Sequence, residues 1–182
     1  IEFFEAIKHK VGWKGCLKSQ LNIIKNAKKN NYSKILILED DIKFSESPDI
    51  DETTLPENWE VLYLGGNIQS LLEEDKTILR KKKWIKMTCF CCQSYIINSS
   101  VYDEIIDGIE NYNKEIDVYF NEVFNTKGTS YMLNPRITSQ IPSYSDIEKT
   151  VKDYYLQGWE DIIEKEKVVS APNDYDEKTN NY

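Results

Sequence analysis

Three adjacent carboxylates, Glu39, Asp40 and Asp41, directly follow a run of four aliphatic residues at positions 35–38. A short, unbroken apolar run is typical of a strand buried on both faces, so the acids are expected where this strand leaves the core. In open α/β sheets, ligands bind beyond the carboxyl ends of the strands. Neighbouring carboxylates raise one another's pKa unless a cation lies among them, and hard oxygen ligands suit Mg²⁺ or Mn²⁺. The motif therefore predicts a divalent cation site, although acids also follow strands simply because they stay solvated.

The composition is that of a globular protein and excludes several partner classes. The chain has 182 residues, which is enough for one domain with a sizeable core. Its net charge of −8 argues against a nucleic-acid partner, and the basic run at 80–83 is too short to change that. No apolar stretch approaches the roughly 20 residues needed to span a bilayer.

The four cysteines do not predict a metal site. Cys89, Cys91 and Cys92 lack the spacing of a zinc ribbon, and His9, the only histidine, lies far from them and from Cys16. We expect Cys89 and Cys91 on one face of a strand and Cys92 on the other. Buried, reduced thiols favour the cytoplasm or another reducing compartment, with a lumenal location left open.

Hydrophobic spacing and turn residues predict alternating helices and strands. The expected helices are 13–30, one capped by Ser99 or Ser100, 115–126, and further helices after 145; the expected strands are 34–38, 61–64, 84–89, 94–97 and 129–133. Residues 45–58 are expected to form a loop, and residues 67–83 an irregular polar segment. This order predicts a mixed α/β sheet with flanking helices in a single domain at 1–148, followed by a helical extension at 149–169 and a disordered tail at 170–182.

A receiver domain of a response regulator also carries paired acids after a buried strand. That class needs a phosphoacceptor Asp at the end of a later strand. The strand at 61–64 is instead followed by Gly65 and Gly66, and the strand at 84–89 contains no Asp. The acids also lie too far from the start of the chain, so this alternative is not favoured.

Six short blocks, in order, resemble glycosyltransferase family 25, the lipooligosaccharide and procollagen galactosyltransferase-like group. They are Gly-Cys-Leu-Lys-Ser-Gln at 15–20, Ile-Leu-Glu-Asp-Asp at 37–41, Asn-Trp-Glu-Val-Leu-Tyr-Leu-Gly at 58–65, Tyr-Ile-Ile at 95–97, Ile-Asp at 116–117, and the segment from Pro135 to Gln140. The likeness spans about residues 4–148. Each block is weak by itself, but their ordered succession is specific.

The resemblance implies a GT-A fold, a divalent cation and a nucleotide-sugar donor, with a UDP-hexose and a glycan or hydroxylated protein acceptor expected. Gln20 departs from the family, which usually has His there. Cys91 and Cys92 stand near the position where the family has a small Gly-Thr pair before the Tyr strand. The family's first strand is not found upstream of position 4, so the domain is expected to be incomplete at its amino terminus. A catalytically inactive binding or scaffold module is therefore the alternative function.

Site roles follow from the resemblance and from the chemistry of glycosyl transfer. Asp41 is the expected metal ligand, Glu39 shares the metal, and Asp40 contacts ribose or water. Asp117 is the expected general base for the acceptor hydroxyl, with Glu115 as second choice, although an acid that starts a helix can also be purely structural.

Two further positions are expected to bind the donor. Gly65 and Gly66 are expected to let the backbone approach the donor or to form a turn, and Gln140 to line the nucleotide pocket or to be an ordinary loop residue.

Overall fold

A mixed sheet forms the centre of the molecule. The computed structural model describes residues 1–47, 50–72, 76–145, 147–152, 160 and 162. The sheet has the order β1-β4-β3-β5, with β1 at Lys34–Leu38, β3 at Val61–Leu71, β4 at Trp84–Asn98 and β5 at Ser130–Leu133. β3 and β5 run parallel, and the other neighbours are antiparallel. The predicted mixed α/β class is confirmed.

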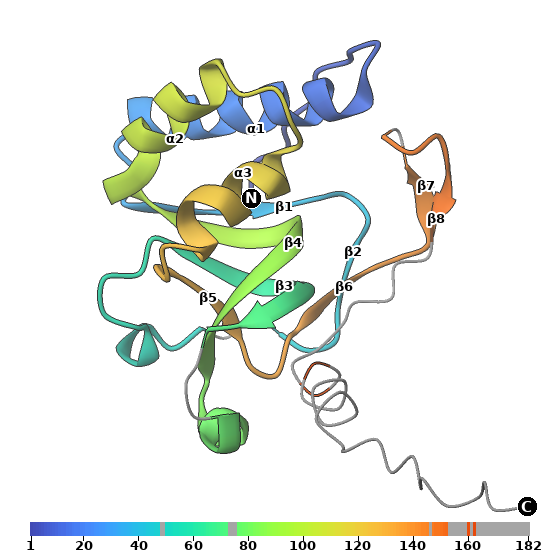
Figure 1. The fold of residues 1–182 in the computed structure, drawn as a ribbon. Coiled ribbons are helices and arrows are strands. Elements are labelled where there is room, and N and C mark those ends of the chain that lie inside the picture. The colour runs from blue at the N-terminus through green and yellow to red at the C-terminus, as the bar shows by residue number, and fades with distance from the viewer. Residues whose placement is uncertain (48–49, 73–75, 146, 153–159, 161, 163–182) are drawn as a thin grey trace, which may run out of the picture.

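Three helices cover one face of the sheet: α1 at Gly12–Lys29, α2 at Tyr102–Glu110 and α3 at Ile116–Phe120, which continues as a π-helical turn at Asn121–Asn125 (Figure 1). Their apolar positions form one core with the sheet, as the helical spacing predicted. Phe120 and Phe124 are fully buried there, next to Tyr95 of β4. The expected helices at 13–30 and 115–126 are thus confirmed.

A smaller core lies on the opposite face of the sheet. Here Leu62, Leu64 and Ile96 pack with Phe44. Phe44 belongs to β2, at Ile42–Phe44, which pairs with β6 at Thr138–Gln140 in a separate two-stranded ribbon. Neither short strand was expected from the sequence, because three residues are too few to show a periodic pattern.

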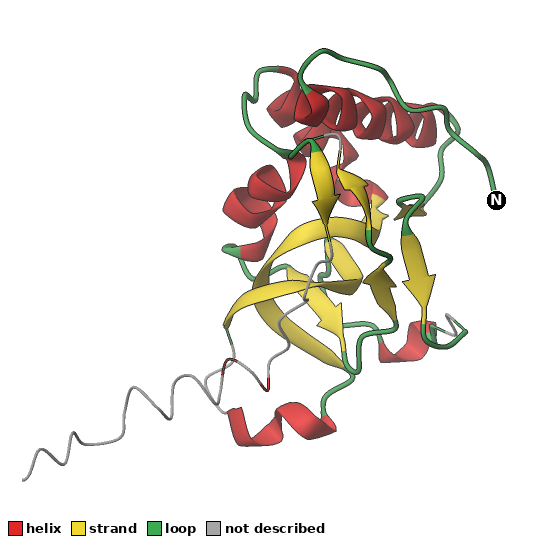
Figure 2. Ribbon diagram, turned by 90° about the vertical axis from the view of Figure 1, so that its right-hand side faces the viewer, coloured by secondary structure: helices red, strands yellow, loops and turns green. Residues whose placement is uncertain are grey.

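Two strands are longer than predicted. β3 does not end at Gly65 but continues to Leu71, and the two strands expected at 84–89 and 94–97 are one strand, β4. β-Bulges shift the register of the pairing between β3 and β4. Within β4, Cys91 has a φ of 68°. The bulge places Cys89 and Cys92 in the same helix-side core, so the expected alternation of the cysteines is wrong. With its strands in yellow, Figure 2 shows the strong curvature of the sheet.

β1 lies at an edge of the described sheet, not at its centre. It pairs only with β4, and its side chains alternate between the helix side and solvent. Ile37 is 6% exposed, whereas Leu36 and Leu38 are 42% and 40% exposed. The expectation of a strand buried on both faces is therefore wrong for the described residues.

Three smaller expectations also change. The turn that leads into α2 is capped by the side chain of Asn98, which accepts the backbone N–H of Ser100, and not by a serine. Helix was expected after residue 145, but residues Thr150–Lys152 form a strand, β8. It pairs with β7 at Ser143–Ser145. The loop at 45–58 contains a 3₁₀ turn at Glu52–Thr54. The expected tail at 170–182 lies outside the described residues.

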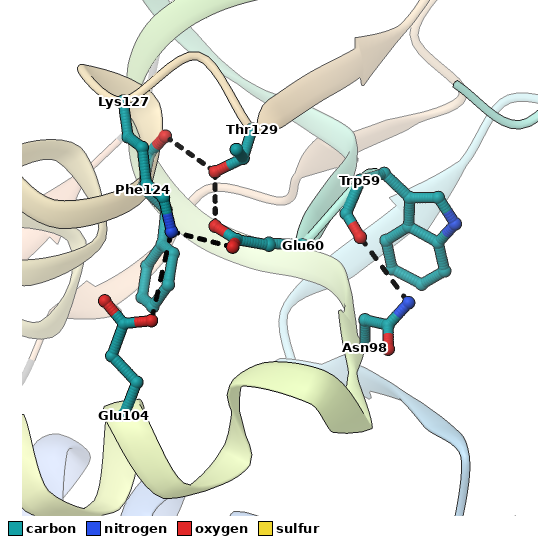
Figure 3. Close-up of polar contacts among 7 residues, drawn as sticks. All are labelled: Trp59, Glu60, Asn98, Glu104, Phe124, Lys127 and Thr129. Carbon is teal, nitrogen blue, oxygen red and sulfur yellow. Dashed lines mark hydrogen bonds and ion pairs between the residues drawn. The ribbon is translucent and has the colours of Figure 1, made fainter. Parts of the chain in front are cut away.

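The Trp-Glu block at the start of β3 has a structural role. Glu60 accepts hydrogen bonds from Lys127 at 2.7 Å and from Thr129, and Lys127 also lies 4.0 Å from Glu104 of α2 (Figure 3). The carbonyl of Trp59 accepts from Asn98 at 3.4 Å (Figure 3). These contacts hold the first residues of β3 against β5 and α2.

Gly15 and Ser19 attach the amino-terminal segment to α1. A Cβ on Gly15 would lie 2.5 Å from the carbonyl oxygen of Ile7, so only glycine lets this backbone cross so closely. The Ser19 hydroxyl accepts the Ile7 N–H at 2.8 Å and donates to the Gly15 carbonyl at 2.8 Å. The first block of the resemblance is thus explained by packing.

Candidate active site

The acid motif occupies the connection between β1 and β2. The Glu39 N–H donates to the Gln93 carbonyl at 2.9 Å, which extends the pairing with β4 by one residue beyond β1. The chain then turns at Asp40 and Asp41 before β2 begins. Glu39 and Asp41 are half-buried and Asp40 is exposed. The acids therefore lie at the end of a strand, as predicted.

Glu39 and Asp41 point toward the same side chain, the amide of Gln140 on β6. The Gln140 Nε2 lies 3.5 Å from Glu39 Oε2 and 3.4 Å from Asp41 Oδ2. Glu39 and Asp41 are two residues apart, a spacing that places side chains on the same side of an extended segment. Gln140 thus belongs to the acid cluster and bridges its two inward-facing carboxylates.

Ser143 is a site residue that the sequence did not indicate. Its hydroxyl donates to Asp41 Oδ2 at 2.8 Å, and the N–H of Ile141 donates to the Asp41 carbonyl at 2.8 Å. The two bonds attach the segment after β6 to the acid motif from about a hundred residues away in sequence. A serine after Pro142 in a polar loop gives no local signal for this contact.

Burial raises the pKa of the Glu39 carboxyl to about 8, and the negative charges of Asp41, Asp117 and Asp40 act in the same direction. In the part of the chain that the structure describes, no Lys or Arg side chain forms an ion pair with Glu39, Asp41 or Asp117. A buried carboxyl in such surroundings needs either a proton or a cation.

Asp117 lies in the first turn of α3, and it contacts β4. Its Oδ2 accepts the N–H of Cys91 at 3.1 Å, and its Oδ1 accepts the N–H of Val118 at 2.8 Å. Its charge contributes to the raised pKa of Glu39 and to that of Cys16, which burial and then Glu39 bring to about 12. Glu115 precedes α3, and its charge is not one of the main causes of the raised pKa of Glu39. Of the two acids considered as base, Asp117 is thus the one electrostatically linked to the acid motif.

Gly65 and Gly66 serve the site indirectly, through packing. They lie inside β3 and do not form the expected turn. A Cβ on Gly65 would lie 2.3 Å from both the carbonyl oxygen and the hydroxyl of Thr138. The close approach that glycine permits is therefore made by β6, and it brings Gln140 to the acids two residues later.

The helix side of the site carries thiols and buried amides. Gln20, at the position where the family usually has His, donates to Cys16 Sγ at 3.8 Å, and its Oε1 is buried without a partner. Gln93, opposite Glu39, is fully buried, and both of its amide atoms lack a partner. The four cysteines are free, with Cys89 and Cys92 buried.

The residues present have the chemistry of a hard-cation site, but they are not arranged as one. Carboxylate oxygens and an amide are the donors that Mg²⁺ and Mn²⁺ accept. Within the described ranges, however, no group of three or more His, Cys, Asp and Glu side chains is placed to hold a metal ion. The two carboxylates with Gln140 thus provide the donor types in one place, without a complete acid cage.

The described residues form a mixed α/β domain with a cluster of acids at the end of β1. The chain belongs to glycosyltransferase family 25, whose model, described as an LPS biosynthesis protein, matches residues 2–155. Membership supports a transferase that uses a sugar donor and an acceptor. The search of curated proteins found no match for this chain. No helix among the described residues is long and apolar enough to cross a bilayer.

Proposed function

We propose that this protein is a metal-dependent glycosyltransferase of GT-A type. It moves a hexose from a nucleotide sugar, most simply a UDP-hexose, to a hydroxyl group of a glycan or protein. The observation that carries the proposal is that Glu39 and Asp41 contact the same Gln140 amide within the region that the family model matches, with the charge of Asp117 acting on Glu39. These acids come from two distant segments and are held by hydrogen bonds from β4 and from the segment after β6.

Glu39 and Asp41 would hold Mn²⁺ or Mg²⁺, with Asp40 directed to the ribose or to water. When bound, the cation supplies charge stabilisation for the departing diphosphate. The chain's own contribution is to hold Asp41 through Ser143 and Ile141, so that the carboxylate has a fixed direction. Burial and the neighbouring acids raise the pKa of Glu39, so a cation bound there would be favoured as the partner of its carboxylate form.

Asp117 would act as general base on the acceptor. Its Oδ2 would take the proton of the acceptor hydroxyl as that oxygen bonds to the anomeric carbon and the bond to the diphosphate breaks. The backbone N–H of Cys91 fixes the orientation of the carboxylate. Because this donor is a main-chain group, the contact does not depend on the thiol.

The Asp117 assignment can be tested by two amide substitutions in a donor-to-acceptor transfer assay. Asp117→Asn keeps the shape of the side chain but cannot accept a proton, so turnover should fall by roughly 10²–10⁴-fold while donor binding survives. Glu115→Gln is the matched control and should keep near-normal turnover. The assignment is wrong if Glu115→Gln abolishes transfer and Asp117→Asn does not.

A binding module without catalysis is the second candidate. It is favoured by Gln20 at the position of the family's usual His and by the lack of a ready three-acid cluster in the described residues. Hydrolysis or transfer of UDP-glucose or UDP-galactose that requires Mn²⁺ would reject this candidate. Metal-dependent donor binding with no turnover in any acceptor screen would support it.

A further inference from the structure

The Gln140 side chain has an unusual hydrogen-bond arrangement for an amide between two acids. Its Nε2 is shared among Glu39 Oε2 at 3.5 Å, Asp41 Oδ1 at 3.5 Å and Asp41 Oδ2 at 3.4 Å. A good N–H···O bond is about 2.9–3.0 Å long, so all three contacts are long. The Oε1 of the same amide is buried and has no partner. The amide thus satisfies neither its donors nor its acceptor well.

The backbone around Gln140 is firmly fixed, which leaves the side chain as the adjustable part. Gln140 lies opposite Ile42 in the β2–β6 pairing. The next residue, Ile141, donates its N–H to the Asp41 carbonyl at 2.8 Å. The Cα of Gln140 is therefore held beside the acid motif. The last torsion of a glutamine is broad and roughly two-fold, so the amide can exchange the places of Nε2 and Oε1 without moving the backbone.

From these contacts we propose that Gln140 is a cation ligand through its amide oxygen. This inference rests on the proposed function, since it assumes that Glu39 and Asp41 hold the cation. In the structure the Nε2 faces the two carboxylates. With a cation among them the amide turns, Oε1 joins the carboxylate oxygens, and the buried oxygen gains a partner. Gln140 then completes a set of hard oxygen donors that the acids alone do not provide.

The alternative role is that Gln140 only donates hydrogen bonds to the acids. The two roles predict opposite effects when the amide is removed. A pure donor competes with the cation for the carboxylate oxygens, so its removal leaves cation binding unchanged or makes it tighter. A ligand contributes an oxygen, so its removal makes binding weaker. The direction of the change therefore separates the two roles.

The experiment measures Mn²⁺ binding to the purified chain by electron paramagnetic resonance, which reports free Mn²⁺. Gln140→Met keeps the length of the side chain but removes both polar atoms. It should weaken binding by at least about 10-fold, the lower end of the range known for residues that only hydrogen-bond to metal ligands. Gln140→Glu supplies a carboxylate oxygen in place of the amide oxygen and should restore binding. Ser139→Ala, at the exposed neighbouring position on β6, is the matched control and should bind like the wild type.

Circular dichroism in metal-free buffer checks that each variant is folded, so that a loss of binding cannot be assigned to misfolding. Mn²⁺ binding by Gln140→Met that equals or exceeds that of the wild type would overturn the ligand role while leaving the proposed cation site intact. Absence of Mn²⁺ binding by the wild type would instead overturn the cation site itself, and the ligand role with it. The two failures are therefore distinguishable.

Discussion

At the residue scale, Glu39 is the acid whose ionisation the folded site clearly disfavours. Its side chain is half-buried next to further acids, and burial with these charges raises its pKa to about 8 from an ordinary value of 4.5. A group with this shift keeps its proton in the folded protein at a pH where the unfolded chain has lost it. Folding stability therefore falls as the pH rises between these two values.

This sign gives a measurable pH dependence. In chelator-treated buffer, the free energy of unfolding in urea should be higher at about pH 5.5 than at about pH 8, in part because of Glu39. Glu39→Gln removes the titrating group and should flatten this slope and stabilise the protein most at the higher pH. Identical slopes for the two proteins would show that Glu39 ionises normally. Wild-type protein at the higher pH should also gain stability when Mn²⁺ is added, since a bound cation favours the charged carboxylate.

At the element scale, the site depends on where β1 and β6 lie. The motif residues are easy to recognise in the sequence, since the aliphatic run of β1 and the three acids stand together. The position of β1 at the edge of the described sheet could not be predicted, because the same four aliphatic residues suit a central strand equally well. Period-two patterns specify alternation but do not specify which neighbours a strand has.

The edge position predicts unequal costs for two neighbouring truncations. Ile37 is 6% exposed on the helix side, so Ile37→Ala should lower the free energy of unfolding by about 2–5 kcal/mol. Leu36 is 42% exposed, so Leu36→Ala should cost less than about 1 kcal/mol. Urea unfolding of both variants tests this difference. Equal, large losses would mean that β1 is covered on both faces in solution.

Because Gly65 of β3 lets β6 approach closely, we expect a substitution at Gly65 to disturb the contact of Gln140 with Glu39 and Asp41. Gly65→Ala places a methyl group 2.3 Å from the backbone of Thr138, so β6 must shift and carry Gln140 with it. We expect both a loss of stability and weaker Mn²⁺ binding. Gly128→Ala is the control: its φ of 77° strains an alanine, but nothing lies within 4 Å of the added carbon. It should lower stability and leave Mn²⁺ binding unchanged, and a similar loss of binding in both variants would contradict this account.

At the scale of the whole molecule, the site is assembled from segments that the sequence does not connect. The acid motif contacts β4, β6 and the segment after β6, and Asp117 of α3 contacts β4. Sequence reasoning identified Glu39, Asp41 and Asp117 as candidates because carboxylates at element ends carry recognisable chemistry. It missed Ser143, because the importance of this residue arises only from a long-range contact with Asp41.

Gly65 and Gly66 show that a local sequence pattern can also predict a feature that the tertiary structure does not contain. A pair of glycines after an apolar run usually marks a turn, and that reading of Gly65 and Gly66 was reasonable from the chain alone. In the fold both glycines lie within β3, and at Gly65 the close approach of β6 is the tertiary constraint that requires glycine. The blocks that resemble the family are therefore of two kinds, those that carry acids and those, such as Gly15 with Ser19, that hold segments together.

The central claim is that Glu39 and Asp41 bind a divalent cation together with the donor diphosphate. Calorimetric titration of uridine diphosphate, with and without Mn²⁺, tests it most directly. The wild type should bind the nucleotide in a Mn²⁺-dependent manner, Asp41→Ala should lose that dependence, and Glu46→Ala, an exposed acid outside the site, should behave like the wild type. Equal Mn²⁺-dependent binding by the wild type and Asp41→Ala would contradict the claim.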